Sequence, residues 1–144
     1  MFGRLANQHA GRRDPLGAAG ERAATRYLKR EGYRVLARNV RVRVGEADLV
    51  CLDQDRRTIV IVEVKARRRG LAGHRASESI VPEAAITAHK QRKLREITRA
   101  LVKLNKWDDR PVRIDVVAIE WPANGNGRRC KPTIRHYIGA VGGD

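Results

Sequence analysis

The feature that most constrains the fold is an apolar segment at residues 58–65 that ends in two charged side chains. Its sequence, Thr-Ile-Val-Ile-Val-Glu-Val-Lys, is rich in β-branched residues, and its apolar side chains fall on both sides of an extended chain. A strand that is apolar on both faces belongs in the middle of a sheet that is covered on both sides. The chain is therefore expected to fold as an α/β protein around this strand, with Glu63 and Lys65 at its end.

The rest of the chain alternates between helix and strand patterns. Residues 16–31 are rich in alanine and stop before Gly32, which favours a helix with a left-handed cap. A second helix is predicted from Pro82 to about Asn105, because apolar residues recur there every three or four positions. Further strands are predicted at residues 33–44, 46–53, 111–120 and 133–138. The predicted order is α, β, β, β, α, β, β, with an antiparallel hairpin around the polar turn at 53–56.

The charge of the chain predicts its kind of partner. Among 144 residues, 31 are Lys or Arg and 16 are Asp or Glu, so the formal net charge is +15, which favours binding to nucleic acid. Residues 1–15 are polar and Arg-rich and predict a mobile basic arm before one domain at 16–144. No apolar run approaches the ~20 residues of a membrane span. We therefore expect a cytoplasmic protein without a membrane partner.

Basic residues cluster in segments that suit contact with phosphates. The cluster after the apolar strand comprises Arg67, Arg68, Arg69 and Arg75. Lys and Arg on open segments bind phosphates without reading bases. No aromatic residue is interleaved with such clusters in the sequence, so sequence-specific readout of single strands is not expected. The alternative is a solvated basic surface that favours solubility and binds no particular partner.

Glu63 and Lys65 place two charges on one strand face where the pattern otherwise has valine. Burying such charges costs several kcal/mol per ion unless they are paired or bound to a metal. One interpretation is an ion pair between the two at the rim of the sheet. In the other, the hairpin brings Asp48 beside Glu63, with an offset that the sequence leaves open. Adjacent carboxylates repel unless a cation joins them, and all-oxygen ligation favours Mg²⁺ or Mn²⁺.

Two helix residues are expected to face the same region. Glu21 aligns with small and apolar residues at helical spacing, although an acid near a helix start also commonly offsets the helix dipole. Lys90 falls on the apolar stripe of the second helix, where it either reaches a phosphate or packs its stem on the sheet. Arg113 and Asp115 share a strand face, and we expect them to form a structural pair.

In chain order, these residues belong to a set of motifs that resembles one protein family. The motifs are Gly20-Glu21-x-Ala23-Ala24, Gly32-Tyr33, Arg38-Asn39, Gly45-Glu46-x-Asp48-Leu49, Val62-Glu63-Val64-Lys65-x-Arg67, Lys90 and Arg113-x-Asp115. The set spans residues 16–137 and resembles the YraN-like family of uncharacterised bacterial proteins. That family looks like a branch of the PD-(D/E)xK enzymes, related to Holliday-junction resolvases. The resemblance implies a restriction-endonuclease-like αβββαβ core, with a mixed central sheet flanked by helices.

The resemblance also implies an activity and a site. It implies a metal-dependent endonuclease that hydrolyses phosphodiester bonds in DNA, including branched or otherwise structured DNA. Asp48 matches the acid of the first core motif, Glu63 and Lys65 match the second motif, and Glu21 matches the helical acid. Asp48, Glu63 and the carbonyl of Val64 would hold Mg²⁺ or Mn²⁺. A homodimer would suit the cutting of two strands.

Fold alone does not fix activity, so two alternatives stay open. The first is a nucleic-acid-binding module whose site has lost turnover. The second is a basic adaptor that docks acidic partners, with Glu63 and Lys65 merely paired.

Overall fold

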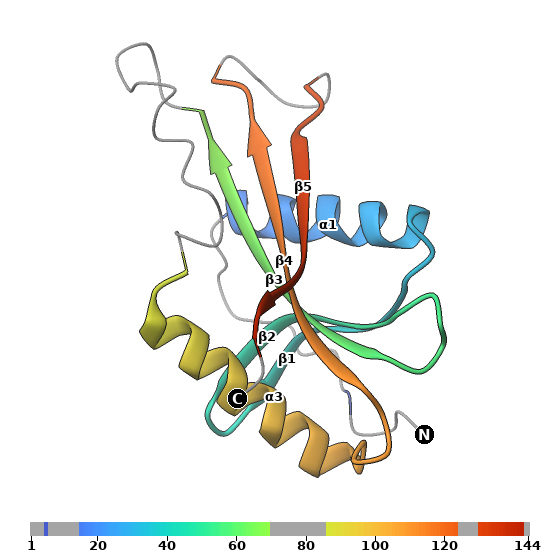
Figure 1. The fold of residues 1–144 in the computed structure, drawn as a ribbon. Coiled ribbons are helices and arrows are strands. Elements are labelled where there is room, and N and C mark those ends of the chain that lie inside the picture. Colours follow the sequence, from blue (N-terminus) through green and yellow to red (C-terminus); the bar gives the residue numbers. More distant parts are fainter. Residues whose placement is uncertain (1–4, 6–14, 70–85, 124–129, 143–144) are drawn as a thin grey trace.

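The computed structural model describes residue 5 and residues 15–69, 86–123 and 130–142. The elements in chain order are α1 (Pro15–Arg30), β1 (Arg34–Val42), β2 (Gly45–Leu52), β3 (Ile59–Arg68), α3 (Ala88–Asn105), β4 (Val112–Trp121) and β5 (Thr133–Val141). The α/β class and the αβββαβ order are confirmed (Figure 1). Most of the basic arm predicted over residues 1–15 lies outside the described residues, as does Arg75.

The strands form one sheet in the order β1-β2-β3-β4-β5. β3 pairs antiparallel with β2 and parallel with β4, so the sheet is mixed and β3 lies at its centre. The pair Leu52↔Ile59 centres the β2–β3 turn between Asp55 and Arg56, one position later than we expected. Arg56 takes the left-handed backbone that this turn needs, with a φ of 61°. The offset that the sequence left open is therefore absorbed by the turn.

One helix covers each face of the sheet. α1 lies behind the sheet in Figure 1 and packs mainly on β3, whereas α3 lies in front and packs on β1 and β2. β3 contributes Val60 and Val62 to the apolar core on the α1 side, and Ile59 and Ile61 to the core on the α3 side. This two-sided burial is what the apolar segment predicted. Neither helix described here has the length and apolar content to cross a membrane.

α3 begins later than predicted. The expected start, Pro82, lies outside the described residues, and the helix begins at Ala88 after a bend at Ile86. Thr87 caps it, because its side-chain hydroxyl accepts a hydrogen bond from the N–H of Lys90 at 3.1 Å. Lys90 therefore lies in the first turn of α3, near the helix start as predicted.

Candidate active site

Close contact between α1 and β3 positions the first acidic residue. A Cβ built on Gly20 would lie 2.5 Å from the Cβ of Ala66, so only glycine allows α1 to approach β3 this closely. Glu21 follows in the helix and is only 7% exposed. Its charge acts on Asp48, which places both acids in one electrostatic cluster, as the helical spacing predicted.

Asp48 lies where the ladder between β2 and β3 stops. The last pair is Leu49↔Val62, and the same register continued by one step sets Asp48 opposite Glu63. Beyond this pair, the N–H of Val64 donates to Oδ2 of Asp48 at 2.8 Å. The Asp48 side chain thus accepts a hydrogen bond that a backbone carbonyl of the neighbouring strand would accept if the ladder continued. The structure brings Asp48 and Glu63 together, as the hairpin predicted.

Glu63 is the centre of the charged cluster. It is 7% exposed, and its Oε1 lies 2.9 Å from Nζ of Lys90 and 3.6 Å from Nζ of Lys65. The ion pair with Lys65 that the sequence suggested is therefore present, but the shorter contact comes from the first turn of α3. Glu46 pairs with Arg41 at 3.6 Å.

The protonation behaviour of the cluster follows from burial and mutual charge. Burial, and then the charge of Glu63, raise the pKa of Asp48 to about 7, although the hydrogen bond from Val64 opposes the shift. Burial and the neighbouring Lys90 lower the pKa of Lys65. Burial also disfavours charged Lys90, but its hydrogen bonds with Glu63 and Lys65 and the charges of Glu63 and Asp48 together outweigh burial, so the pKa of Lys90 is raised. Perturbed groups gathered in this way are typical of functional sites.

Asn39 belongs to one of the family motifs, Arg38-Asn39, and is a neighbour of the site to which sequence reasoning assigned no role. It lies one position beyond the pair Val40↔Ala47, which sets it across the β1–β2 ladder from Asp48. Its backbone is left-handed, with a φ of 53°. Its buried Oδ1 has no hydrogen-bond partner among the described residues. A buried amide oxygen without a partner is uncommon and is usually satisfied by water or a ligand.

The oxygen donors suit one divalent cation that keeps several of its waters. Nowhere in the described parts of the chain do three His, Cys, Asp or Glu side chains gather closely enough to hold a metal ion. Mg²⁺, however, is usually held by one or two carboxylates together with water. Asp48 and Glu63 supply two carboxylates, and Asn39 supplies an oxygen that a bound water would satisfy. Mg²⁺ or Mn²⁺ would be held by Asp48, Glu63 and the carbonyl of Val64, with Glu21 outside this donor set.

The arginines predicted to contact nucleic acid lie at the end of β3. Nε of Arg67 is 3.4 Å from Oε2 of Glu120 on β4, and Nε of Arg69 is 3.2 Å from Oε1 of the same carboxylate. Arg68 ends the strand and is exposed. Sequence reasoning missed Glu120, because its partners lie on a strand more than fifty residues earlier.

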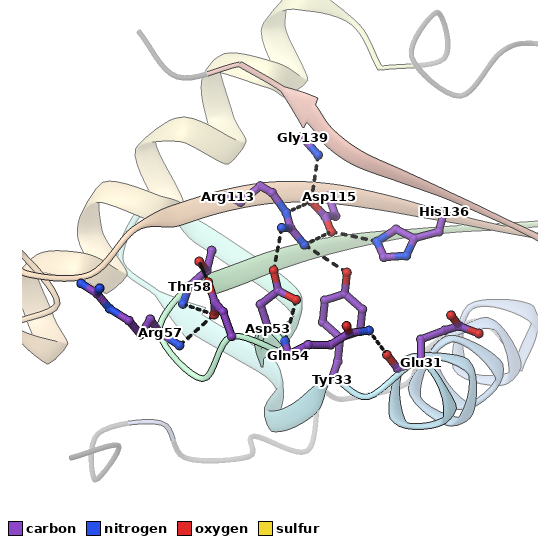
Figure 2. A network of polar contacts seen from close by, with 11 residues as sticks. Glu31, Tyr33, Asp53, Gln54, Arg57, Thr58, Arg113, Asp115, His136 and Gly139 are labelled. Atoms are coloured by element: carbon purple, nitrogen blue, oxygen red, sulfur yellow. Dashed lines mark hydrogen bonds and ion pairs between the residues drawn. The ribbon is translucent and has the colours of Figure 1, made fainter.

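A second polar cluster, shown in Figure 2, lies on the α1 side of the sheet. Arg113 donates two hydrogen bonds to Asp115, of 2.8 and 3.0 Å, and one to Asp53, of 2.8 Å. The same Asp115, which is 0% exposed, accepts from the N–H of Gly139 and lies 2.8 Å from Nε2 of His136. Burial opposes charged Asp115, but these hydrogen bonds outweigh it and its pKa is lowered. The predicted pair of Arg113 and Asp115 is thus a structural tie between strands.

Comparison with known proteins identifies the family. The sequence profile of the uncharacterised protein family UPF0102 matches residues 20–119. The chain belongs to this family. Membership of UPF0102 bears out the YraN-like resemblance at the level of the family, and the matched range contains Glu21, Asp48, Glu63 and Lys65.

Individual UPF0102 proteins resemble this chain over most of their length. A UPF0102 protein of Symbiobacterium thermophilum is 41% identical over 116 residues, which cover 81% of this chain and 90% of that protein. A UPF0102 protein of Pelobacter propionicus is 35% identical over 124 residues, covering 86% of this chain and 80% of its own.

Proposed function

We propose that this protein is a metal-dependent nuclease of the PD-(D/E)xK type that hydrolyses phosphodiester bonds in DNA. The observation that carries the proposal is the meeting of Asp48, Glu63 and Lys65 where the β2–β3 ladder ends. One acid on one strand, and an acid-x-lysine on the next, is the arrangement that such enzymes use. The αβββαβ order supports the same assignment.

Each residue of the cluster has a role in this proposal. When bound, the metal supplies Lewis-acid polarisation of the scissile phosphate and a water of lowered pKa. Lys65 lies on the same strand face as Glu63, and its ammonium group would orient that water and offset developing negative charge. Lys90 positions Glu63 through their 2.9 Å contact. Glu21 adds negative charge near Asp48, which favours a cation at the two carboxylates.

The strand end beyond the site would bind the DNA backbone. Arg67, Arg68 and Arg69 begin two positions after Lys65, so phosphates held there would lead into the site. Lys90 and Arg75 complete the proposed phosphate-binding set. The net charge of +15 supports a polyanionic substrate.

Cleavage assays on variants in which an amide replaces a carboxylate test the proposal. We expect supercoiled plasmid, linear duplex, single strands or a four-way junction to be cut with Mg²⁺ or Mn²⁺ but not with EDTA. Asp48→Asn and Glu63→Gln should each slow cleavage more than about a hundredfold, because each removes a metal ligand. Both should bind DNA as well as the wild type or better, since repulsion of phosphate falls.

An exposed acid provides the matched control. Asp109 lies in the turn after α3, so Asp109→Asn makes the same chemical change away from the site and should leave cleavage unchanged. Undiminished cutting by both site variants would disprove the nuclease assignment.

One observation favours a second candidate function, a binding module without turnover. Lys90 and Lys65 already neutralise Glu63, so the site has counter-ions without a metal. This candidate predicts DNA binding without cleavage, and a melting temperature that Mg²⁺ and Mn²⁺ leave unchanged. A ligand that binds only the folded protein must stabilise it, so a metal-dependent rise in melting temperature would exclude this candidate.

A further inference from the structure

The three strands β3, β4 and β5 have a polar face that α3 does not cover. They extend past α3 in Figure 1, and among the described elements α3 packs on β1 and β2 instead. His136 identifies which side chains of β5 point to this face. Since His136 contacts Asp115 and Tyr27 on the α1 side, its neighbours Arg135 and Tyr137 must point to the α3 side.

The strand register aligns these residues with the candidate active site. In one row, Glu63 pairs with Val116, and Val116 pairs with Tyr137. Directly paired residues of neighbouring strands lie on the same face. Tyr137 therefore lies on the same face as Glu63, two strands away, which is about 10 Å at the usual strand spacing.

The two rows beyond Glu63 carry the basic groups. Lys65 pairs with Ala118, and Ala118 with Arg135. Arg67 pairs with Glu120 in the row after that. We call the surface formed by Lys65, Arg67, Ala118, Glu120, Thr133, Arg135 and Tyr137 the open face. In its middle row, the small side chain of Ala118 lies between the longer side chains of Lys65 and Arg135, so the surface is lower at Ala118 than on either side.

The open face combines positive charge with a partly exposed aromatic residue. Arg135 is exposed, and Lys65, Arg67 and Tyr137 are half-buried. Glu120 already holds Arg67 and Arg69 side by side. A basic groove that follows the backbone, joined to an aromatic ring on which a base stacks, is how proteins hold single strands without reading their sequence. The sequence concealed this pairing, because β5 lies about seventy residues after the arginine cluster.

From this arrangement we infer that the open face binds an unpaired strand of DNA, with one base stacked on Tyr137 while a neighbouring phosphate lies at Glu63. The inference rests on the proposed nuclease function and adds the class of substrate, which is DNA with a single-stranded segment. The bases of an intact duplex are stacked on one another, so their faces are not available to Tyr137.

Binding measurements in EDTA test this inference without depending on cleavage. The full chain would be titrated against a fluorescent single strand and a duplex of equal length at one salt concentration. Tyr137→Leu keeps an apolar side chain but removes the ring, so we expect about tenfold weaker binding to the single strand and less than twofold to the duplex. Tyr137→Phe keeps the ring and should bind both as the wild type does. Arg135→Gln should weaken both complexes by the same factor, since it removes only a phosphate contact.

A spectroscopic readout on the wild type keeps the test valid if Tyr137→Leu fails to fold. A 2-aminopurine base moved stepwise along the single strand should lose fluorescence on binding, at the position that stacks on Tyr137. The inference falls if no position responds, if Tyr137→Phe loses as much affinity as Tyr137→Leu, or if Tyr137→Leu loses none. If the wild type binds neither oligonucleotide, the nuclease proposal falls as well. If it cuts duplex DNA in Mg²⁺ while Tyr137→Leu binds normally, only the inference about the open face is wrong.

Discussion

At the scale of residues, the candidate site is governed by the balance between its acidic and basic side chains. Asp48 and Glu63 lie together, and the charge of a third acid, Glu21, also acts on Asp48, while Lys65 and Lys90 bring two ammonium groups. The surplus negative charge appears in the pKa of Asp48, which burial and the two other acids raise to about 7. A proton on Asp48 balances the cluster without metal, and a divalent cation would balance it in place of that proton. The same excess of acid thus accounts for both the raised pKa and the suitability for Mg²⁺.

The raised pKa of Asp48 predicts a specific dependence of stability on pH. Between its ordinary value of 3.8 and about 7, the folded chain holds a proton on Asp48 that the unfolded chain has lost. The stabilisation is fully present below about pH 4 and is lost as pH rises through 7. Asp48→Asn removes this dependence, so relative to the wild type it should gain about 3 kcal/mol between pH 5 and pH 8, at about 1.36 kcal/mol for each of two pH units. Urea unfolding in EDTA measures this difference.

Asp109→Asn controls for the general effect of removing a carboxylate, since Asp109 is exposed. Its stability should follow that of the wild type at both pH values. Parallel pH curves for Asp48→Asn and the wild type would show that Asp48 is ionised in the folded chain at pH 5.

At the scale of elements, the close contact of α1 with β3 predicts a clash that a second change relieves. Gly20→Ala puts a methyl group 2.5 Å from the Cβ of Ala66, and overpacking of this kind costs about 1–3 kcal/mol. Alanine also favours a helix by about 1 kcal/mol over glycine, so the net loss should be at most about 2 kcal/mol. Ala66→Gly removes the opposing methyl, and the double variant should recover the clash energy.

A double-mutant cycle measured by thermal unfolding separates this clash from other effects. We expect a favourable coupling of at least about 1 kcal/mol between the two changes. Additive effects would mean that α1 shifts away without cost. Cleavage should fall in Gly20→Ala and return in the double variant, because the same contact positions Glu21.

Local elements were the most predictable from the sequence. The pairing of Asp48 with Glu63 is set by one hairpin, and hydrophobic alternation on both arms is enough to find it. The start of α3 was missed, because the capping hydroxyl of Thr87 decides it and Pro82 gave a competing signal. The position of Tyr137 in the same row as Glu63, two strands away, was missed as well. It depends on pairing across three strands and on a register irregularity in β4 and β5 that no local pattern reveals.

At the scale of the whole molecule, the two faces of the sheet have different roles. On the α1 side, Arg113 and Asp115 tie β4 to the β2–β3 turn through Asp53 and to β5 through His136 and Gly139. Removing one partner from such a buried network leaves an unpaired charge, which lowers the stability of the fold. The network therefore holds these strands in register. The α3 side carries the candidate site and the basic strand end. The rigid side thus supports the strands from which the site is built.

The same division predicts where duplex DNA binds. If the end of β3 holds phosphates, the double variant Arg67→Gln with Arg69→Gln should lose two phosphate contacts. The slope of log K against log salt concentration should then become shallower by about 1.8, at about 0.9 for each phosphate. Arg22→Gln with Arg26→Gln removes the same charge from the exposed side of α1, on the other face of the sheet, and should leave the slope unchanged. Fluorescence anisotropy on a linear duplex in EDTA measures both slopes. Equal changes in the two double variants would mean that net charge alone attracts DNA, whereas a change confined to the first would locate the duplex at the end of β3.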